Sequence, residues 1–281
     1  MAEAKENWTP EVYQNNLSFV PKYASKIMEW LDPQPDDTIL DLGCGDGILD
    51  VQLGQTLSQG TGHLLGIDNS QSMIAAAEKA AESFGLSEKC RFKVLDAAAE
   101  LVAVTGEFSK VFSSSAMHWI LASPESREPF FAGVRDALVP GGTFVFEMGG
   151  MGNISEMRAA VLSAVGRRVG LENIKEPWWF PDEEWVEGVM GKVGGLVLER
   201  AEREWRLTKA DKGGVGGWVR LVGAQLFDLI DDEKEREACV REVIDVLEIV
   251  CKQPDGSYAF TYVRLRVVAR KLSRCPPEQY Q

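Results

Sequence analysis

A carboxylate followed by three glycines at two-residue spacing is the segment best suited to bind a small molecule: Asp41, Gly43, Gly45 and Gly47, in T-I-L-D-L-G-C-G-D-G. The apolar and β-branched residues directly before Asp41 are typical of a buried parallel strand. Glycines after such a strand let the backbone bend sharply and approach a ligand with no Cβ in the way. The segment therefore predicts a strand-to-helix turn that holds a nucleotide-like ligand.

Two other interpretations compete with this one. The dinucleotide fingerprint G-x-G-x-x-G, counted from Gly43, needs a glycine at position 48, where this chain has Ile48. The glycine that lets helix and strand pack closely in such units is therefore missing, and so is the usual pyrophosphate cradle. This spacing argues against a nicotinamide-dependent oxidoreductase. A plain glycine turn without a ligand is the second interpretation.

Two further carboxylates follow the next expected strands, as Asp41 follows the first: Asp68 and Asp96. Parallel strands end at one edge of the sheet, and ligands of open α/β folds bind beyond that edge. A carboxylate at position 68 can accept hydrogen bonds from both ribose hydroxyls, and one at position 96 from an adenine amine. Asp41 can orient the turn or the amino-acid end of the ligand. Each acid alone is most simply a solvated loop residue, but together they predict a site for an adenosyl ligand.

The elements that must position these residues alternate between strand and helix. The expected strands span residues 38–40, 63–67, 91–95, 110–113 and 143–147. Asn69 and Ser70 can cap the alanine-rich helix that Gly85 stops, and Pro140-Gly141-Gly142 is expected to stop a later helix. This alternation predicts an α/β fold with an open parallel sheet and helices on both faces.

Beyond Gly149 the rhythm changes. The expected elements there are helices over 154–165, 218–230 and 231–253 and strands over 193–207 and 258–271. We expect a single domain over residues 1–281. Its expected parts are an N-terminal helical lid (1–35), a cofactor-binding core (36–150), the remaining strands with an inserted helical substrate cap (151–272), and a flexible tail (273–281).

Composition limits the partners of this chain. A formal net charge of −13 over 281 residues, with a pI near 4.8, suits neither nucleic acid nor an anionic membrane. The N-terminus lacks the apolar stretch of a signal peptide, and no apolar run reaches membrane-spanning length. The five cysteines form no C-x-x-C pair, and the two histidines are His63 and His118, so neither a metal site nor a disulfide framework is expected. We expect a cytoplasmic protein, monomer or dimer, that acts on a small molecule.

The order of motifs resembles that of class I S-adenosylmethionine-dependent methyltransferases: D-L-G-C-G-D-G, G-I-D-N-S-Q-S-M, V-L-D-A-A, S-S-A-M-H-W and L-V-P-G-G-T. The resemblance covers about residues 36–150. Within that superfamily the chain is most similar to the trans-aconitate methyltransferase group, on the segments N-W-T-P-E-V-Y, A-M-H-W and Y-V-R-L-R-V-V-A-R-K. The resemblance implies a Rossmann-like, seven-stranded methyltransferase sheet with an N-terminal helical lid and a C-terminal helical cap. It also implies S-adenosylmethionine as cofactor and S-adenosylhomocysteine as product.

The resemblance further assigns residues to the cofactor. The implied set is Trp8, Tyr13, Asp41, Gly43, Cys44, Gly45, Gly47, Asp68, Asn69, Ser70, Met73, Asp96, Ala97, Ser113 and Ser114. Within it, Asp68 holds the ribose, and Trp8 and Tyr13 form part of the lid. The chain departs from the family pattern at Ser113-Ser114-Ser115, where Asn or Asp is more usual near the ligand's amino group.

The methyl acceptor is expected to meet one histidine and several tryptophans: His118, Trp119, Trp178, Trp179 and Trp218. The carboxylate of a small organic acid is already ionised at pH 7, so it needs no base but does need a hydrogen-bond donor such as a His or a Trp N–H. For a phenol or an amine a general base becomes useful, and His118 is the histidine nearest the active edge. The competing interpretation makes His118 a packing residue beside Trp119 and the tryptophans part of the core.

We therefore predict an enzyme that O-methylates a small organic acid. N- or C-methylation of another small metabolite, and a non-catalytic cofactor-binding protein, are the alternatives. Arg220 and Gln225 lie near Trp218 after a glycine-rich loop and can supply carboxylate contacts or lie on the surface.

Overall fold

A single mixed sheet organises the part of the chain that the structure describes. The structure is a computed structural model that describes residues 24–101, 104, 108–210 and 213–273. The strands are β1 (Thr38–Leu42), β2 (His63–Asp68), β3 (Cys90–Val94), β4 (Phe108–Ser114), β5 (Leu138–Gly149), β6 (Leu196–Lys209) and β7 (Ala259–Lys271). Their order in the sheet is β3-β2-β1-β4-β5-β7-β6. This arrangement confirms the expected seven-stranded, Rossmann-like sheet.

The direction of the strands differs from the simple expectation of a parallel sheet. Strands β1 to β5 pair in parallel, as the alternation with helices predicts. Strand β7 inserts between β5 and β6 and runs antiparallel to both. An antiparallel neighbour can be reached without a crossover helix. The alternation of strands and helices in the sequence therefore does not predict the direction of β6 and β7.

Helices cover both faces of this sheet, and a further group of helices lies beyond one end of it. They are α2 (Ser25–Leu31), α3 (Ile48–Leu57), α4 (Gln71–Ser83), α5 (Ala97–Glu100), α6 (Met117–Ile120), α7 (Pro124–Ala137), α8 (Ser155–Val169), α9 (Glu183–Val193), α10 (Gly214–Val222), α11 (Ala224–Phe227) and α12 (Glu233–Val250), with a 3₁₀ turn η3 (Leu171–Asn173). None of these described helices is long and apolar enough to cross a membrane.

Strand β1 illustrates how the two faces are filled. Leu40 and Leu42 lie in a core cluster with Phe131 of α7, whereas Ile39 lies in another with Ile27 of α2. Successive side chains of a strand point to opposite faces, so β1 contributes apolar side chains to both layers. Because both faces are buried, β1 is apolar without alternation, and its one charged residue is a candidate for function rather than for solvation.

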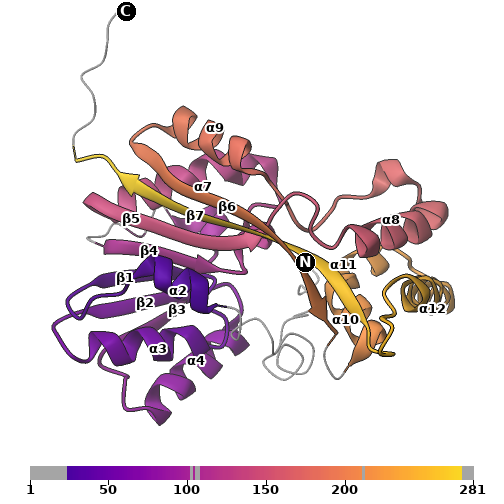
Figure 1. Ribbon diagram of the computed structural model, residues 1–281, viewed down its shortest axis with the longest axis horizontal. Coiled ribbons are helices and arrows are strands. Elements are labelled where there is room, and N and C mark those ends of the chain that lie inside the picture. The colour runs from indigo at the N-terminus through magenta and orange to yellow at the C-terminus, as the bar shows by residue number, and fades with distance from the viewer. Residues whose placement is uncertain (1–23, 102–103, 105–107, 211–212, 274–281) are drawn as a thin grey trace, which may run out of the picture.

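Four helices form a separate group beyond one end of the two longest strands. Figure 1 shows α8, α10, α11 and α12 together at the right of the molecule, next to the ends of β6 and β7. Their buried side chains form a third cluster that includes Trp178, Trp218 and Phe260 of β7. Helix α8 follows β5, and the other three helices lie between β6 and β7 in the sequence. We call this group the helical cap.

Three expected element boundaries were wrong. Helix α7 ends at Ala137, and Pro140-Gly141-Gly142 lies inside β5, where the strand has already begun at Leu138. The expected helix over 218–230 begins at Gly214 and divides at Gly223 into α10 and α11. The expected strand from residue 193 begins at Leu196, because two glycines with positive φ, Gly194 and Gly195, separate it from α9.

Candidate active site

A cavity of about 560 Å³ opens over the carboxyl ends of β1 to β4 and continues toward the helical cap. Fourteen of the residues expected at the site line it: Asp41, Gly43, Cys44, Gly45, Asp68, Asn69, Ser70, Met73, Asp96, Ala97, Ser114, His118, Trp119 and Trp178. Gly47, Ser113, Trp179 and Trp218 lie outside its lining. Trp8 and Tyr13 lie outside the described residues.

The glycine turn forms one wall because its backbone bends where side chains would not fit. The amide groups of Gly43 and Cys44 both donate to the Ile67 carbonyl, over 2.8 and 3.0 Å, which holds the turn against β2. Gly43 has a φ of +78°, and a Cβ added there would lie 2.2 Å from that of Ala116. Gly45 also has a positive φ, of +57°, but faces open space. A residue with a side chain at position 43 would therefore collide with the loop after β4, while position 45 leaves room for a ligand.

Gly47 serves packing rather than the cavity wall. It precedes α3 with a φ of +73°, and a Cβ there would lie 2.8 Å from the Cβ of Ala77 in α4. The absence of a side chain lets α3 and α4 approach each other closely.

Asp68, the last residue of β2, connects the loops after β1 and β2. Its Oδ2 accepts from the Gly45 amide over 3.1 Å, and its Oδ1 accepts from the Ser70 amide over 2.9 Å. Ser70 in turn caps α4, because its Oγ accepts from the Met73 amide over 3.2 Å. Asp68 therefore holds both loops from a position in the cavity wall.

Asp96 has an equivalent place after β3. Its Oδ1 accepts from the Ala98 amide over 2.9 Å and so caps α5, while its own amide donates to Glu100 Oε2 over 3.0 Å. These contacts fix the start of α5, so that Asp96 and Ala97 face the cavity from a defined position.

Asp41 does not end its strand as expected, because β1 continues to Leu42. It is buried next to Asp50 of α3, a second buried acid that no motif in the sequence marks. Burial raises the pKa of Asp41 well above its ordinary value, and the negative charges of Asp50 and Asp68 raise it further. Burial likewise raises the pKa of Asp50, to about 7, although the neighbouring Asp41 side chain opposes this rise. The two acids therefore hold a proton between them near neutral pH.

The end of β4 separates the roles of two neighbouring serines. Ser113 is fully buried, and its Oγ donates to the Leu42 carbonyl over 2.7 Å, which ties β4 to β1. Ser114 lines the cavity, and its buried Oγ has no partner among the described residues. Of these two serines, only Ser114 therefore lines the cavity.

His118 of α6 forms part of the wall farther from the glycine turn. Its Nδ1 accepts from the Gly149 amide over 3.4 Å, and its ring lies against those of Trp119 and Phe180. Burial, together with the positive charge of Arg264, lowers the pKa of His118 to about 3. The imidazole is therefore neutral, and since Nδ1 accepts, its proton is on Nε2.

The four expected tryptophans divide between cavity and core. Trp119 and Trp178 both line the cavity and pack edge to face with ring centres 5.5 Å apart. Trp179 instead lies under the guanidinium of Arg127, 3.9 Å from its ring centre. Trp218 stacks on Phe260 at 4.0 Å in the core of the helical cap. The packing interpretation therefore describes Trp179 and Trp218.

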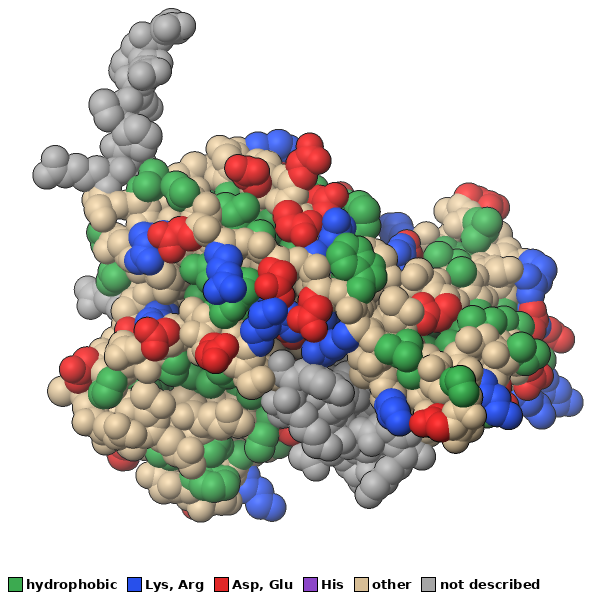
Figure 2. All heavy atoms as spheres, in the orientation of Figure 1, with side chains coloured by type: hydrophobic (Ala, Val, Ile, Leu, Met, Phe, Trp, Pro, Cys, Tyr) green, Lys and Arg blue, Asp and Glu red, His purple; other side chains and the backbone are tan. Residues whose placement is uncertain are grey.

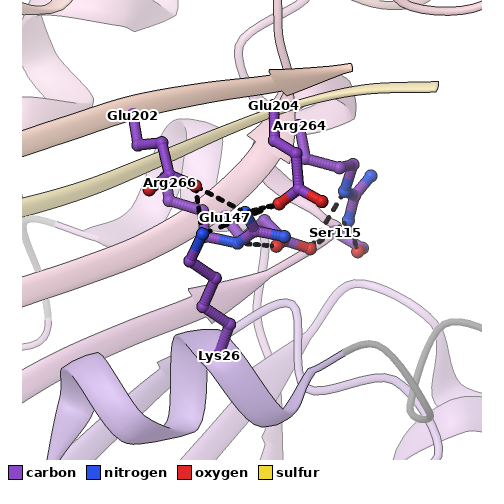
Figure 3. A network of polar contacts seen from close by, with 7 residues as sticks. All are labelled: Lys26, Ser115, Glu147, Glu202, Glu204, Arg264 and Arg266. Atoms are coloured by element: carbon purple, nitrogen blue, oxygen red, sulfur yellow. Dashed lines mark hydrogen bonds and ion pairs between the residues drawn. The ribbon is translucent and has the colours of Figure 1, made fainter. Parts of the chain in front are cut away.

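Several lining residues come from elements that the motifs did not connect to the site: Asn153, Ile154, Phe180, Val222, Tyr262 and Arg264. Of the two polar residues noted near Trp218, Gln225 lines the cavity, whereas Arg220 pairs with Glu237 over 2.6 Å on the surface. Arg264 of β7 donates to Glu147 of β5 (Figure 3). Glu147 and Arg264 are 117 residues apart, so no local motif could have joined them.

Comparisons with known proteins agree with this geometry. Residues 39–142 match the family model of a methyltransferase domain. An uncharacterized methyltransferase (C70.08c) of Schizosaccharomyces pombe is 33% identical over 273 residues, 95% of this chain and 99% of the relative. A trans-aconitate 2-methyltransferase of Deinococcus radiodurans is 27% identical, over 50% of this chain and 49% of the relative. A juvenile hormone acid O-methyltransferase of Bombyx mori is 34% identical, over 37% of this chain and 35% of the relative.

A solved structure shares the fold. The geranyl diphosphate C-methyltransferase of Streptomyces coelicolor A3(2), in complex with Mg2+, geranyl-S-thiolodiphosphate and S-adenosyl-L-homocysteine, superposes with a TM-score of 0.52 at 15% identity. The match covers 90% of this chain and 76% of that one. The chain belongs to the class I S-adenosylmethionine-dependent methyltransferases. The narrower trans-aconitate group is matched over half of the chain only, and that assignment stays a hypothesis.

Proposed function

We propose that this methyltransferase transfers the methyl group of S-adenosylmethionine to the carboxylate of a small organic acid. The observation that carries the proposal is the distribution of titratable groups around the cavity. The aspartates that line it, Asp41, Asp46, Asp68 and Asp96, all lie at the glycine-turn end. Among the described lining residues of the opposite end there is no carboxylate and no lysine. An acceptor bound at that end has to be reactive without losing a proton to either group.

The glycine-turn end suits the cofactor. In this proposal Asp68 binds the ribose hydroxyls, and Asp96 with Ala97 binds the adenine amine. Ser114, whose hydroxyl has no partner in the described part of the chain, faces the methionine portion together with Asp41. The cofactor supplies a methyl group already activated on a sulfonium. The protein then has to align the acceptor and exclude water.

His118 fits a hydrogen-bond donor better than a general base. With a pKa of about 3 its imidazole accepts a proton poorly at pH 7, because base strength falls with pKa. Its Nε2–H can instead donate to an anionic acceptor. A phenol or an ammonium group would need a base in order to react, whereas a carboxylate needs only donors. This difference favours an acid over the N-methylation alternative.

Two further observations support a small acid as the acceptor. Two of the relatives carry names that refer to acids, trans-aconitate 2-methyltransferase and juvenile hormone acid O-methyltransferase, although each is matched over half of this chain or less. The charge of the protein is the second observation. Acidic and basic side chains are interspersed on the face seen in Figure 2, and the net charge is −13, which suits a small molecule better than nucleic acid.

The test is methyl transfer from labelled cofactor to a panel of carboxylic acids, phenols and amines. We expect base-labile methyl esters from one or more acids. The His118→Ala variant should reduce kcat/KM by about tenfold or more, through the loss of a donor to a charged group. In the wild type, kcat should show no titration of a histidine between pH 6 and 8. Methylated phenols or amines without esters would contradict the proposal, as would cofactor binding without transfer to any acceptor.

A further inference from the structure

Arg264 presents an unused part of its guanidinium at the acceptor end of the cavity. It lies on β7, is buried, and lines the cavity. Its Nε and Nη2 donate to Glu147 Oε1 over 2.9 and 2.8 Å, and Nη2 also donates to Ser115 Oγ (Figure 3). Nη1 has no hydrogen-bond or ion-pair partner in the described part of the chain. Among the described residues, Glu147 and Ser115 therefore hold one edge of the guanidinium and leave Nη1 for a ligand.

Glu147, the carboxylate that pairs with Arg264, compensates the charge of Arg264 only in part, because a second arginine shares it. Glu147 also pairs with Arg266, which pairs in turn with Glu202 and Glu204 of β6. Although burial opposes ionisation, Arg264 and Arg266 hold the pKa of Glu147 below its ordinary value, so it is charged. One buried carboxylate is thus shared by two buried arginines, and Glu202 and Glu204, which balance Arg266, are partly exposed.

The excess positive charge reaches the cavity wall. Arg264 contributes to the lowered pKa of His118, after burial, and to the lowered pKa of Arg206 on β6, again after burial. The opposite end of the cavity has the reverse character, because its titratable lining residues are aspartates and a cysteine. The cavity is therefore acidic at one end and basic at the other.

The loop that holds Arg264 is itself strained. Ser115 has a φ of +63°, which is unusual for a residue with a side chain, and its amide donates to the Glu147 carbonyl over 2.8 Å. Ser115 also lines the cavity. Strained backbone persists where the surrounding contacts determine it, and it is concentrated at binding sites. Here the contacts that hold Ser115 also fix the guanidinium.

We propose that Arg264 is the specificity-determining residue for the acceptor, and that its Nη1, together with His118 Nε2–H, binds the carboxylate that is methylated. Glu147 and Ser115 are positioning residues, since they act by fixing Arg264. This role for Arg264 rests on the proposed function, because Arg264 is the group that would recognise the carboxylate of the acid to be methylated. Buried arginine donors favour a carboxylate over its neutral amide because the hydrogen bonds are charge-assisted and the charge is otherwise incompletely compensated.

Binding can be measured separately from transfer. The protein saturated with S-adenosylhomocysteine is titrated in a calorimeter with phenylacetate, octanoate and fumarate, and with the amide of each. We expect the wild type to bind one or more of these acids at least about tenfold more tightly than the amide. Arg264→Gln should remove that preference and leave affinity for the amide within about twofold. Arg264→Lys keeps the buried charge and hence the fold, but it has no planar fork and should weaken acid binding by about tenfold.

Arg266→Gln is the matched control, because Arg266 lies on the same strand and pairs with the same carboxylate but does not line the cavity. It should retain the preference for the acid. Loss of the preference in Arg266→Gln as large as in Arg264→Gln would attribute the effect to the network and overturn the proposal. So would a wild type that binds none of the acids better than its amide, or an Arg264→Lys variant that binds them as the wild type does.

The transfer assay separates the two proposals. Esters formed equally well by wild type and Arg264→Gln would leave the proposed function standing and overturn the role of Arg264. Acid binding that depends on Arg264, without methylation of any acid, would leave the role of Arg264 standing and overturn the proposed function.

Discussion

Asp68 shows how one side chain can serve structure and ligand together. Its two oxygens accept from Gly45 and Ser70, so the loops after β1 and β2 are joined before any ligand is bound. The same carboxylate is placed at the edge of the cavity. A cofactor that bonds to Asp68 therefore meets loops that are already ordered, and less entropy is lost on binding.

Replacing Asp68 should weaken cofactor binding more than it weakens the fold. We expect Asp68→Ala to reduce the affinity for S-adenosylmethionine by about 1–3 kcal/mol, through the loss of charge-assisted hydrogen bonds. Asp68→Asn, which keeps one acceptor oxygen, should lose less. Isothermal calorimetry measures the affinities, and thermal unfolding checks that both variants are folded. Unchanged affinity in Asp68→Ala would contradict the assignment of Asp68 to the ribose.

The acid pair formed by Asp41 and Asp50 should make stability depend on pH. Burial raises the folded-state pKa of both groups above that of an unfolded aspartate, with Asp50 at about 7. A carboxyl group with a raised folded pKa stabilises the fold fully below its unfolded pKa, and this contribution is lost as pH rises through the folded value. The free energy of unfolding should therefore fall between pH 5 and 8, by about 3 kcal/mol for Asp50 alone.

Urea unfolding of the protein without cofactor, at pH 5 and pH 8, tests this dependence. The Asp50→Asn variant has no proton to lose at that position, so its free energy of unfolding should vary less with pH. Asp245 on α12 is exposed, so Asp245→Asn is the control variant. Its free energy of unfolding should depend on pH as that of the wild type does. Parallel pH dependence in wild type and Asp50→Asn would refute the role of the pair.

At the level of strands and loops, the glycine turn contains two residues with similar conformation and different surroundings. Both Gly45 and Gly47 have positive φ, but only Gly47 is enclosed, by the backbone and Cβ of Ala77. Gly47 thus determines how closely α3 and α4 pack, and Gly45 leaves space beside the cofactor site. The same motif sets helix packing and ligand access at positions two residues apart.

This contrast predicts different costs for the same substitution. Gly47→Ala should lower the free energy of unfolding by more than about 2 kcal/mol, because the left-handed conformation and the collision with α4 both oppose it. Gly45→Ala should cost only about 1 kcal/mol, from the conformation alone, and should instead weaken cofactor binding. Urea unfolding and calorimetry measure the two effects. Equal loss of stability in both variants would show that α4 can move away from Gly47.

The strands and loops that carry the cofactor residues could be predicted because each signal is local. A buried strand, its terminal acid and the following glycine or cap residue lie within about ten positions, as in Asp68 and Ser70. Arg264 could not be found in this way, because its partner Glu147 lies on another strand far away in the sequence. Trp218 was expected near the acceptor from its residue type, but stacking on Phe260 depends on how the cap folds back on β7. Tertiary contacts therefore decided the acceptor end.

Over the whole molecule, the cavity joins two packing units. Its cofactor end is built from loops of the sheet, whose core lies in the clusters around Leu40 and Ile39. Its acceptor end includes Ile154, Trp178 and Val222, whose side chains belong to the cluster of the helical cap. Changes in the cap should therefore affect the acceptor while the cofactor site remains intact.

Trp218 offers a direct test of this division, because it is buried in the cap and does not line the cavity. Trp218→Ala should lower the free energy of unfolding by roughly 3–5 kcal/mol, as for other large-to-small core substitutions. Amide hydrogen exchange should accelerate in α8, α10 and α12 but much less in β1, β2 and β4. The Kd for S-adenosylmethionine should stay within about twofold of the wild type, since the residues assigned to it lie on the sheet. Trp178→Ala, which removes a cavity-lining residue of the same cluster, should also raise KM for the acceptor. If exchange in Trp218→Ala rose equally in cap and sheet, the two units would unfold together, and the acceptor end could not vary independently of the cofactor end.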